Sequence, residues 1–430
     1  MKTTNRVRVS VGAVALAVLG GLFLAAPVAA QLPSVSAATL GTGGNNTATV
    51  RGFGAIGANP AGLGMPGPGF SLALAPIQAL SGLDPISLTD LGNAGGKLLS
   101  DATKADWLSR VTQSGGQSGT AAVGLSAVSL NVGRIGFQLS TIASADVDME
   151  PSIVELALYG NAGRTGTPVD LALGGSSGDG FAVTTAGVSV GIPLHAQTGT
   201  MALGATLKYS MGQALAVVRD QGGSVQSDPV AVRVSLPVVS VDPDSFKINN
   251  GSGVGLDVGF QMKRGRTAFG AAVMNLFNTF SWNTDRLVYR AGTVELQQGT
   301  DSTSFDKQAY GSAPSELRSA VDGMTFKPTV SVGAAYDVWP DLTVSADART
   351  RFGDGMSIDP KTHVGAGAEY RGFGFVHVRA GLAVITRGYQ AGGGLSLILG
   401  PVDLSAAAAF QGGQVGQATL VQLTLSWGGY

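Results

Sequence analysis

Three histidines occur in the chain, and two of them lie where a catalytic site could be built. His363 and His377 fall in neighbouring segments of alternating polarity, with Glu369, Arg371 and Arg379 close by. A histidine beside a carboxylate is a common general base, so these residues could support hydrolysis. They also fit the water-filled interior of a β-barrel, the fold argued below, in which side chains of opposite charge pair with one another. We favour this second interpretation and expect no enzyme activity, no cofactor and no metal site.

Other short motifs do not predict a nucleotide-binding or metal-binding site. The segment Gly52–Gly57 matches the dinucleotide pattern GxGxxG, but Asn59-Pro60 follows where that pattern needs a helix. We therefore interpret it as a flexible glycine segment. The acidic groups Asp242-Pro243-Asp244 and Asp146/Asp148/Glu150 lack the spacing of a calcium loop. The chain has no cysteine, which excludes disulfides and thiolate metal sites.

The segments around these residues alternate between apolar and polar side chains. In Val330–Val338 the even positions are Val, Val, Ala, Tyr and Val, and the odd positions are Ser, Gly, Ala and Asp. The same period of two continues in Val364–Tyr370 and in Val376–Val384. This period predicts strands with one apolar face and one polar face.

The first 30 residues have the pattern of a secretory signal peptide. Lys2, Arg6 and Arg8 precede an apolar stretch from Val9 to Ala26, and Val28-Ala29-Ala30 offers a small-residue cleavage site. No later stretch has the roughly 18–20 apolar residues that a spanning helix needs. An exported chain of alternating strands is best explained by a barrel in the cell outer membrane, with lipid outside and water inside.

Composition excludes some partners and narrows the fold. The signal contains three of the 27 Lys and Arg and none of the 28 Asp and Glu, so the remainder has a net charge of −4. Such a balance gives no basic footprint for nucleic acid. The 65 glycines exceed the usual share of roughly 7%. In a barrel, glycine relieves crowding where the wall bends or packs against an inner element.

We expect three regions. Residues 1–30 are the signal, residues 31–69 form a Gly/Pro-rich plug-like segment, and residues 70–430 form an antiparallel all-β transmembrane barrel. Within the barrel, residues 84–118 are a helical excursion, with a helix after Ser100, and residues 291–322 are a long polar loop. The alternating segments, including one at 152–159, correspond to about 14 membrane strands.

Charged residues within the strands predict which face of each strand lines the water-filled lumen. A lipid-facing Arg or Lys at mid-membrane costs about 2–4 kcal/mol, so such side chains should point into the lumen. A secreted soluble sandwich would alternate too, but the strand number and the lack of a second apolar layer argue against it. The charges expected to face the lumen are Lys208, Asp257, Asp337, Asp347, Arg349, His363 and Glu369.

A series of motifs in a fixed order resembles the FadL/PorV-like superfamily of bacterial outer-membrane barrels, within an uncharacterised branch. The resemblance spans most of the chain after the signal. The matching segments are Gly57–Leu63, Phe70–Leu74, Gly96–Asp101, Leu156–Asn161, Gly204–Gly212, Gly255–Gly259 and Asn275–Phe277.

The resemblance implies a 14-stranded barrel whose N-terminal segment enters and plugs the lumen. Asn59, Pro60, Gly62 and Leu63 are the plug candidates that it suggests. Its relatives pass hydrophobic molecules inward, or serve as shuttle and scaffold factors in protein secretion. One departure is the last strand, where the apolar phase ends at Trp427 and leaves Tyr430 out of register.

Three functions remain open. We rank passive transport of a small hydrophobic ligand first, because a plug with an apolar pocket would let a ligand leave sideways. A structural or secretion-associated barrel that binds an envelope protein ranks closely behind, and a hydrolase ranks third. Outer-membrane lipid is a partner in all three. An apolar cavity against residues 53–70 would favour transport, and a packed or polar lumen would favour the structural role.

Overall fold

The computed structural model describes residues 32–33, 36–160, 170–195, 197–227, 230–245, 247–297, 300–386, 388–413 and 417–428. The expected signal peptide lies outside the described residues.

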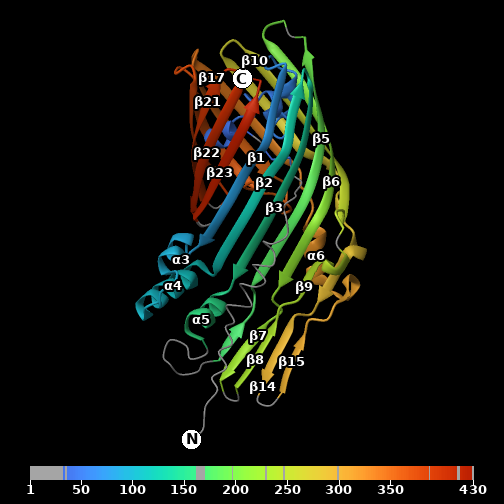
Figure 1. Cartoon of the computed structure of the whole chain (residues 1–430), viewed down its shortest axis with the longest axis vertical. Helices are drawn as coiled ribbons and strands as arrows, with labels where there is room; N and C mark the ends of the chain where they lie inside the picture. The colour runs from blue at the N-terminus through green and yellow to red at the C-terminus, as the bar shows by residue number, and fades with distance from the viewer. Residues whose placement is uncertain are drawn as a thin grey trace.

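Fourteen strands in the described part form a closed antiparallel ring, because the last strand pairs with the first at Leu72 and Trp427 (Figure 1). The predicted barrel and its strand number are confirmed. In ring order the strands are β1 (Phe70–Asp84), β2 (Gln117–Val132), β3 (Ile135–Met149), β5 (Ser177–Leu194), β6 (Thr200–Arg219), β10 (Gly251–Arg264), β11 (Thr267–Asn278), β17 (Thr329–Trp339), β18 (Leu342–Arg351), β19 (Thr362–Tyr370), β20 (Val376–Ile385), β21 (Gly388–Leu399), β22 (Val402–Gly413) and β23 (Gln417–Trp427).

The alternation of side chains separates the two faces of this ring. Val332 and Val364 are 49% and 61% exposed on the outside, whereas Ser331 and His363 beside them are buried. In the described part of the chain, no helix is long and apolar enough to cross a membrane.

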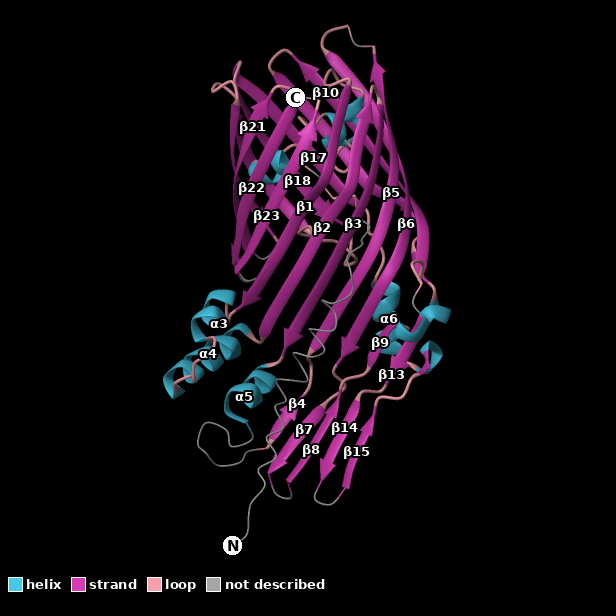
Figure 2. Ribbon diagram, in the orientation of Figure 1, coloured by secondary structure: helices cyan, strands magenta, loops and turns pink. Residues whose placement is uncertain are grey.

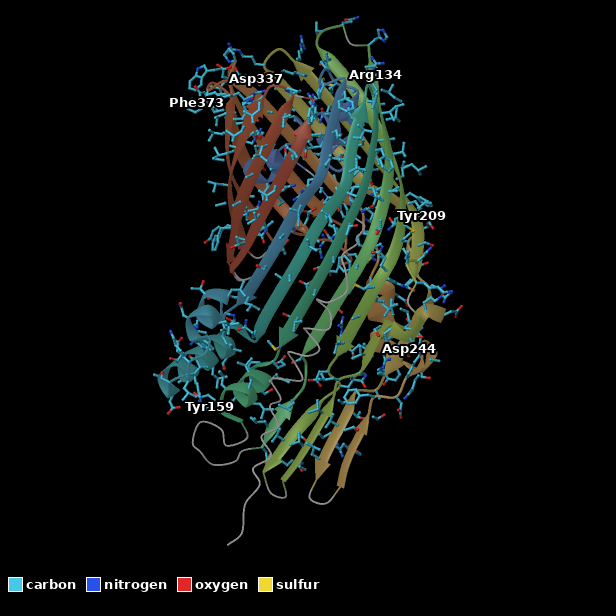
Figure 3. The ribbon with its side chains drawn as sticks, viewed as in Figure 1. Arg134, Tyr159, Tyr209, Asp244, Asp337 and Phe373 are labelled. Carbon is cyan, nitrogen blue, oxygen red and sulfur yellow. The ribbon has the colours of Figure 1, made fainter. Side chains whose placement is uncertain are left out.

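The two ends of the barrel differ. At one end, here the short-turn end, tight turns such as 133–134 and 265–266 join the strands; the other is the long-loop end (Figure 2). Figure 3 places Arg134, Asp337 and Phe373 at the short-turn end and Tyr159 and Asp244 at the long-loop end. β1, β2, β3, β5 and β6 have 15 to 20 residues and run on into the long-loop end, whereas β17 to β23 have 9 to 12.

The long-loop end carries most of the remaining elements. β9 (Val238–Val241), β13 (Leu287–Arg290) and β16 (Gln308–Ala309) extend β6, and β12 (Ser281–Trp282) pairs with β10. A separate five-stranded sheet contains β4 (Leu171–Leu173), β7 (Gly223–Ser227), β8 (Val230–Ser235), β14 (Thr293–Gln297) and β15 (Thr300–Ser304). The short 3-10 helices here are η4 (Pro243–Ser245), η5 (Thr284–Arg286) and η6 (Tyr310–Ser312).

Two segments differ from the sequence prediction. Residues 152–159 are not a strand but belong to the helix α5 (Pro151–Tyr159), because a short apolar run is ambiguous and Pro151 starts a helix well. Residues 291–322 are not a loop: they contain β14, β15 and most of α6 (Ser315–Gly323). β14 finds its partner in β8, about 60 residues earlier, which no local pattern reveals.

Two helices occupy 84–118, namely α3 (Leu88–Ala94) and α4 (Asp101–Ser114). Ser100 caps α4 by accepting a hydrogen bond from the Thr103 amide, as its position predicts. The apolar residues Ile86, Trp107, Val111 and Val154 join these helices to α5.

The start of α3 should make this helical unit sensitive to acid. Burial raises the pKa of Asp90, but hydrogen bonds from Ser87 and Arg110 outweigh it and lower the pKa overall. Because the folded pKa is lowered, the stabilisation is complete above the ordinary carboxyl pKa of roughly 3.9 and disappears as the pH falls through the lowered value.

We expect amide-exchange protection factors of residues 88–114 to fall in acid and to be constant near neutral pH. Asp90→Asn should remove most of this pH dependence and cost about 1 kcal/mol at pH 7, the usual size of a lost cap. Wild-type protection that is unchanged in acid would contradict the assignment.

The N-terminal residues 36–69, here the inner segment, lie within the ring (blue in Figure 1). They contain α2 (Ala37–Gly41), η1 (Gly52–Ala55) and η2 (Pro60–Leu63). The segment then leaves the interior at the short-turn end, where Phe70 begins β1 opposite Val132.

Candidate functional site

Glycines of the wall allow the inner segment to touch the strands backbone to backbone. A Cβ at Gly204 would lie 2.1 Å from the carbonyl carbon of Pro60, and one at Gly381 would lie 2.1 Å from the Thr42 oxygen. These contacts explain part of the high glycine content. The wall glycines whose Cβ would come within about 3 Å of the inner segment are Gly136, Gly191, Gly204, Gly259, Gly270, Gly365, Gly367, Gly381, Gly392 and Gly394.

The four plug candidates lie together in this segment. Asn59 is fully buried, and its side-chain amide donates to the carbonyls of Thr47 (2.9 Å) and Phe260 (3.1 Å). Its oxygen accepts from the Ala61 amide, so it also caps η2, in which Pro60 takes the first position. Gly62 leaves no room for a Cβ beside Val50, and Leu63 packs into a small apolar cluster with Ile56.

Two of the expected lumen charges bind the inner segment. The Asp347 carboxylate accepts a hydrogen bond from the Thr47 amide at 2.8 Å. The Nε2 atom of His363 lies 3.0 Å from the side-chain oxygen of Asn45. Both side chains are buried, so they hold the segment and are out of contact with bulk water.

Lys208 and Asp257 form a buried ion pair inside the wall. Their Nζ and Oδ1 atoms are 2.5 Å apart, and the side chains are 6% and 0% exposed. Asp257 also accepts from the Asn275 amide at 2.7 Å. The pair therefore stabilises a bulge, because β10 pairs Leu256 with Phe277 and then Val258 with Val273.

The remaining charges lie nearer the short-turn end or line a lumen cavity. Lys263 pairs with Asp337 at 2.7 Å, and Thr343 joins Asp337 to Arg371. Glu369 pairs with Arg379 at 2.7 Å. Arg349 lines a small cavity of about 90 Å³ beside the inner segment.

The two histidines do not form one site. His363 pairs across strands with Ile385, eight residues along β20 from His377, which corresponds to roughly 25 Å. The expectation that they lie on neighbouring strands is correct, but they occupy opposite ends. Among the residues described, no group of three or more His, Asp or Glu side chains could hold a metal ion.

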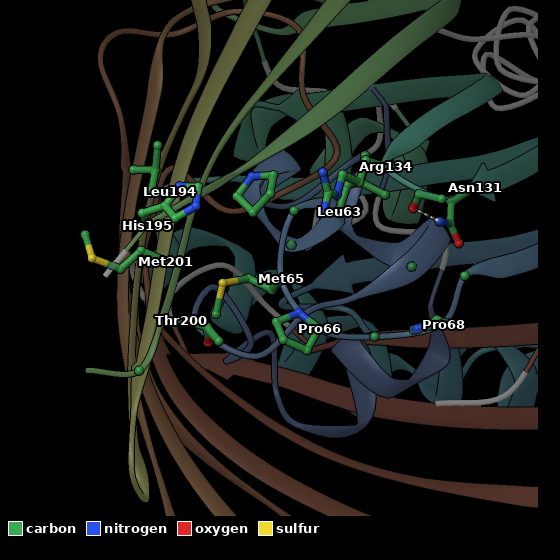
Figure 4. A pocket seen from close by; sticks show the side chains of 18 residues that line it. Leu63, Met65, Pro66, Pro68, Asn131, Arg134, Leu194, His195, Thr200 and Met201 are labelled. Carbon is green, nitrogen blue, oxygen red and sulfur yellow. Dashed lines mark hydrogen bonds between the residues drawn. The ribbon is translucent and has the colours of Figure 1, made fainter. Parts of the chain in front are cut away.

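Two larger cavities touch the inner segment. One, of about 510 Å³, combines Leu63, Met65 and Met201 with Arg134 and His195 (Figure 4). The other, of about 350 Å³, has charged walls that include Lys263, Asp337, Glu369, Arg371 and Arg379. Neither is a purely apolar pocket, so against residues 53–70 the lumen is packed or polar.

An apolar core occupies the long-loop end of the lumen, and sequence reasoning missed it. It joins inward-facing residues of β3, β5 and β6 to α6 and to apolar residues that come before and after α6 in the chain. Phe280 stands at its centre, with edge-on contacts of 5.4 Å to both Trp282 and Phe326. The signal in the sequence was the group of large aromatics in segments that lack alternation. Its buried members are Ile142, Phe181, Val183, Leu215, Val217, Val239, Phe280, Trp282, Leu287, Tyr289, Ala313, Leu317, Val321, Phe326, Met356 and Ile358.

The wall beside this core has a seam, formed by residues 275–282 on one side and 324–328 on the other. In the described residues, the backbone ladder between β11 and β17 ends at Met274 and Thr329. Beyond this point, side chains make the contacts that a ladder would make. The hydrogen bonds run from Asn275 to the Lys327 carbonyl (3.4 Å), Asn278 to the Phe326 carbonyl (3.1 Å), Trp282 to the Met324 carbonyl (2.9 Å) and Thr325 to the Phe280 carbonyl (3.2 Å).

Comparisons with known proteins agree on the fold. The chain is similar in structure to a FadL homologue from Pseudomonas aeruginosa, with 13% identity, a TM-score of 0.50 and coverage of 94% of this chain and 100% of the other. It is equally similar to the CymD monoaromatic hydrocarbon channel, with 13% identity, a TM-score of 0.50 and coverage of 93% and 98%. The toluene transporter TbuX of Ralstonia pickettii has 13% identity, a TM-score of 0.49 and coverage of 92% and 98%.

Sequence comparison assigns the family. No curated protein matches the chain. The sequence profile described as "Family of unknown function (DUF5723)" matches residues 73–409, most of the barrel. The chain therefore belongs to the DUF5723 family, and its fold is that of the FadL-like barrels.

Proposed function

We propose that the protein passes small hydrophobic compounds through the side of an outer-membrane barrel, at the seam. The observation that carries this proposal is the position of the apolar core directly behind a stretch of wall without a backbone ladder. Four side-chain hydrogen bonds, each worth about 1 kcal/mol net, and the ring contact of Phe280 with Phe326 take the place of a continuous ladder there, so the seam is the discontinuity at which this wall can part. Leu276 and Phe277 are exposed on the outside of this stretch and would meet lipid.

The rest of the interior favours a sideways route over an axial one. The inner segment fills the ring at mid-height, and the charged cavity on its far side is a poor path for an apolar molecule. A hydrophobic compound that enters the apolar core would therefore leave through the seam into the bilayer. CymD, a monoaromatic hydrocarbon channel, supports this substrate class by analogy of fold alone.

The proposed location is the cell outer membrane, reached by way of a cleaved signal peptide at residues 1–30. Barrels of this type have short periplasmic turns and longer outward loops, so the short-turn end would face the periplasm. Lumen-facing charges and the inner segment as a plug are part of the same proposal.

Liposomes provide the first test. Vesicles that contain the purified protein should take up radiolabelled toluene or a radiolabelled long-chain fatty acid faster than empty vesicles. If vesicles with and without the protein take up each probe at the same rate, transport is refuted.

A cross-linked pair of cysteines tests the seam itself. The chain has no cysteine, so Asn278→Cys with Lys327→Cys can be bridged by a bis-maleimide that carries a reducible disulfide. We expect uptake to stop when the bridge forms and to return when it is reduced. A matched bridge between Ala271→Cys and Val332→Cys, which pair within the intact ladder, should leave uptake unchanged. Loss of uptake in both would show that the route is elsewhere.

A second candidate function is supported by the packing of the inner segment. Backbone contacts with wall glycines and a packed or polar lumen are what a structural or secretion-associated barrel would have. In that case α3 to α5 and the five-stranded sheet would bind an envelope protein. Cross-linking in native membranes should then recover a stoichiometric partner, and a protein recovered alone would exclude this role.

A further inference from the structure

The rim of the short-turn end has a notch between two hairpins. Ile135, the first residue of β3, pairs with Val190, but the pairing of β5 with β6 continues to Leu194 and Met201. The β5–β6 hairpin therefore stands four residues, or roughly 13 Å, beyond the end of β3. On its other side β10 reaches the same height, since Lys263 pairs with Thr200. The step is thus confined to the β3 side.

The cavity of about 510 Å³ occupies this notch. Its inner wall is the end of the inner segment, residues 62–69, and its flanks are the turn 133–134 and residues 193–195 and 199–201 of the β5–β6 hairpin. In Figure 4, Arg134 lies on one side and His195 on the other, with Leu63, Met65 and Pro66 between them.

The charges in the notch are of one kind. Arg134 is the one permanently charged side chain among the described lining residues, His195 is a second basic group, and none carries a carboxylate. Within the described ranges, neither the Arg134 side chain nor the His195 side chain has a hydrogen-bond or ion-pair partner, although the Arg134 carbonyl accepts from the Gly191 amide. Elsewhere on this rim, Lys263 and Arg371 are tied to Asp337 or Glu369. Two basic side chains on opposite sides of a cavity that has no carboxylate among its described lining residues fit an anion.

The outer side of the notch is apolar. Ile135 and Ile192 are 60% and 53% exposed on the outer wall, directly beside Arg134 and Pro193 of the notch. Within the notch, Leu194 is exposed and adds further apolar surface, and the mostly buried side chains of Leu63 and Met65 line the inner wall. A free phosphate would leave this surface unused, whereas an amphipathic anion would cover it.

We infer that the notch binds the headgroup of a membrane phospholipid, with its phosphate between Arg134 and His195 and its acyl chains along Ile135 and Ile192. A basic residue at the membrane interface attracts anionic headgroups, and the bidentate guanidinium suits phosphate oxygens. This site is separate from the seam, and it holds whether or not the seam passes cargo.

Binding of a short-chain lipid to the purified full chain tests the inference. The probe is dihexanoyl phosphatidylglycerol, added to delipidated protein in an uncharged detergent and followed by native mass spectrometry. Arg134→Gln and His195→Gln together should weaken binding at least about tenfold, as expected for lost hydrogen bonds to a charged group. Arg264→Gln, at an exposed arginine that ends β10 and does not line the notch, should leave binding unchanged.

Two further ligands distinguish the possible sources of the anion. Dihexanoylglycerol, which lacks the phosphate, should bind far more weakly than the phospholipid, and equal binding would overturn headgroup recognition. Inorganic phosphate should compete poorly, and competition at equal concentration would assign the notch to a soluble anion instead.

A photoactivatable phospholipid gives a readout on the wild-type protein that does not depend on variants. It should label residues 62–69 or 193–201, and labelling confined to other parts of the wall would overturn the assignment.

Discussion

Gly204→Ala is expected to release the inner segment from the wall and to open an ion-conducting path through a barrel that is otherwise closed. The new methyl group would lie 2.1 Å from the carbonyl carbon of Pro60 and 2.2 Å from the Ala61 nitrogen. Both neighbours are backbone atoms of η2, so no rotamer change can relieve the clash. Overpacking of this kind costs about 1–3 kcal/mol or more. Moving η2 away is cheaper than distorting β6, which around Gly204 is paired on both sides, with β5 and with β10.

Planar-bilayer recordings should measure this effect directly. Wild-type protein should show little conductance, and Gly204→Ala should show frequent openings. The single variant Gly191→Ala, whose methyl group would lie 2.1 Å from the Gly64 nitrogen, should open more often than Gly204→Ala.

The matched control is Gly393→Ala in β21. Its methyl would meet no atom closer than 3.7 Å, an ordinary contact, and its recordings should resemble the wild type. Heat-modifiable migration on a gel should show that all three variants are folded. A folded Gly204→Ala protein that stays closed and keeps residues 36–64 protected from protease would contradict the role of the inner segment as a plug.

The barrel could be predicted because its signal is local. In Val330–Val338 and Val364–Tyr370 each residue's face follows from its neighbours, and the ring forms when enough such strands follow one another. The polar hairpin of β14 and β15 could not be predicted in this way. β14 pairs locally with β15, but the other edge of β14 pairs with β8, which lies far away in the chain.

The candidate site divides in the same manner. The seven charges were predicted to face the lumen because a charge within an alternating strand is costly in lipid. Their partners were not, since the contact between Asp347 and Thr47 joins residues 300 positions apart. The excess of glycine suggested an inner element, but which glycines touch it depends on the path of that element. The seam could not be predicted, because it consists of a missing strand pairing beyond Met274 and Thr329, between residues 275–282 and 324–328.

Lys208→Met should destabilise the barrel by about 3–5 kcal/mol, since it leaves the Asp257 carboxylate buried without its counterion. Asp257 keeps the hydrogen bond from the Asn275 amide, but its second oxygen already has no partner among the described residues. Equilibrium unfolding in urea, with the protein in lipid vesicles, measures the free energy of unfolding. Lys208→Met with Asp257→Asn should recover most of the loss, because the cost arises from the uncompensated charge more than from the missing attraction.

Lys263→Met is the matched control, since it breaks another Lys–Asp pair between strands. Lys263 is 42% exposed and pairs with Asp337 at 2.7 Å near the short-turn end. Water solvates the remaining carboxylate there, so the loss should be about 1 kcal/mol or less. Equal losses for Lys208→Met and Lys263→Met, or no recovery in the double variant, would mean that burial of the Lys208 pair is not what matters. A large difference would instead show that the bulge at Asn275, and with it one end of the seam, is held closed by a buried charge pair.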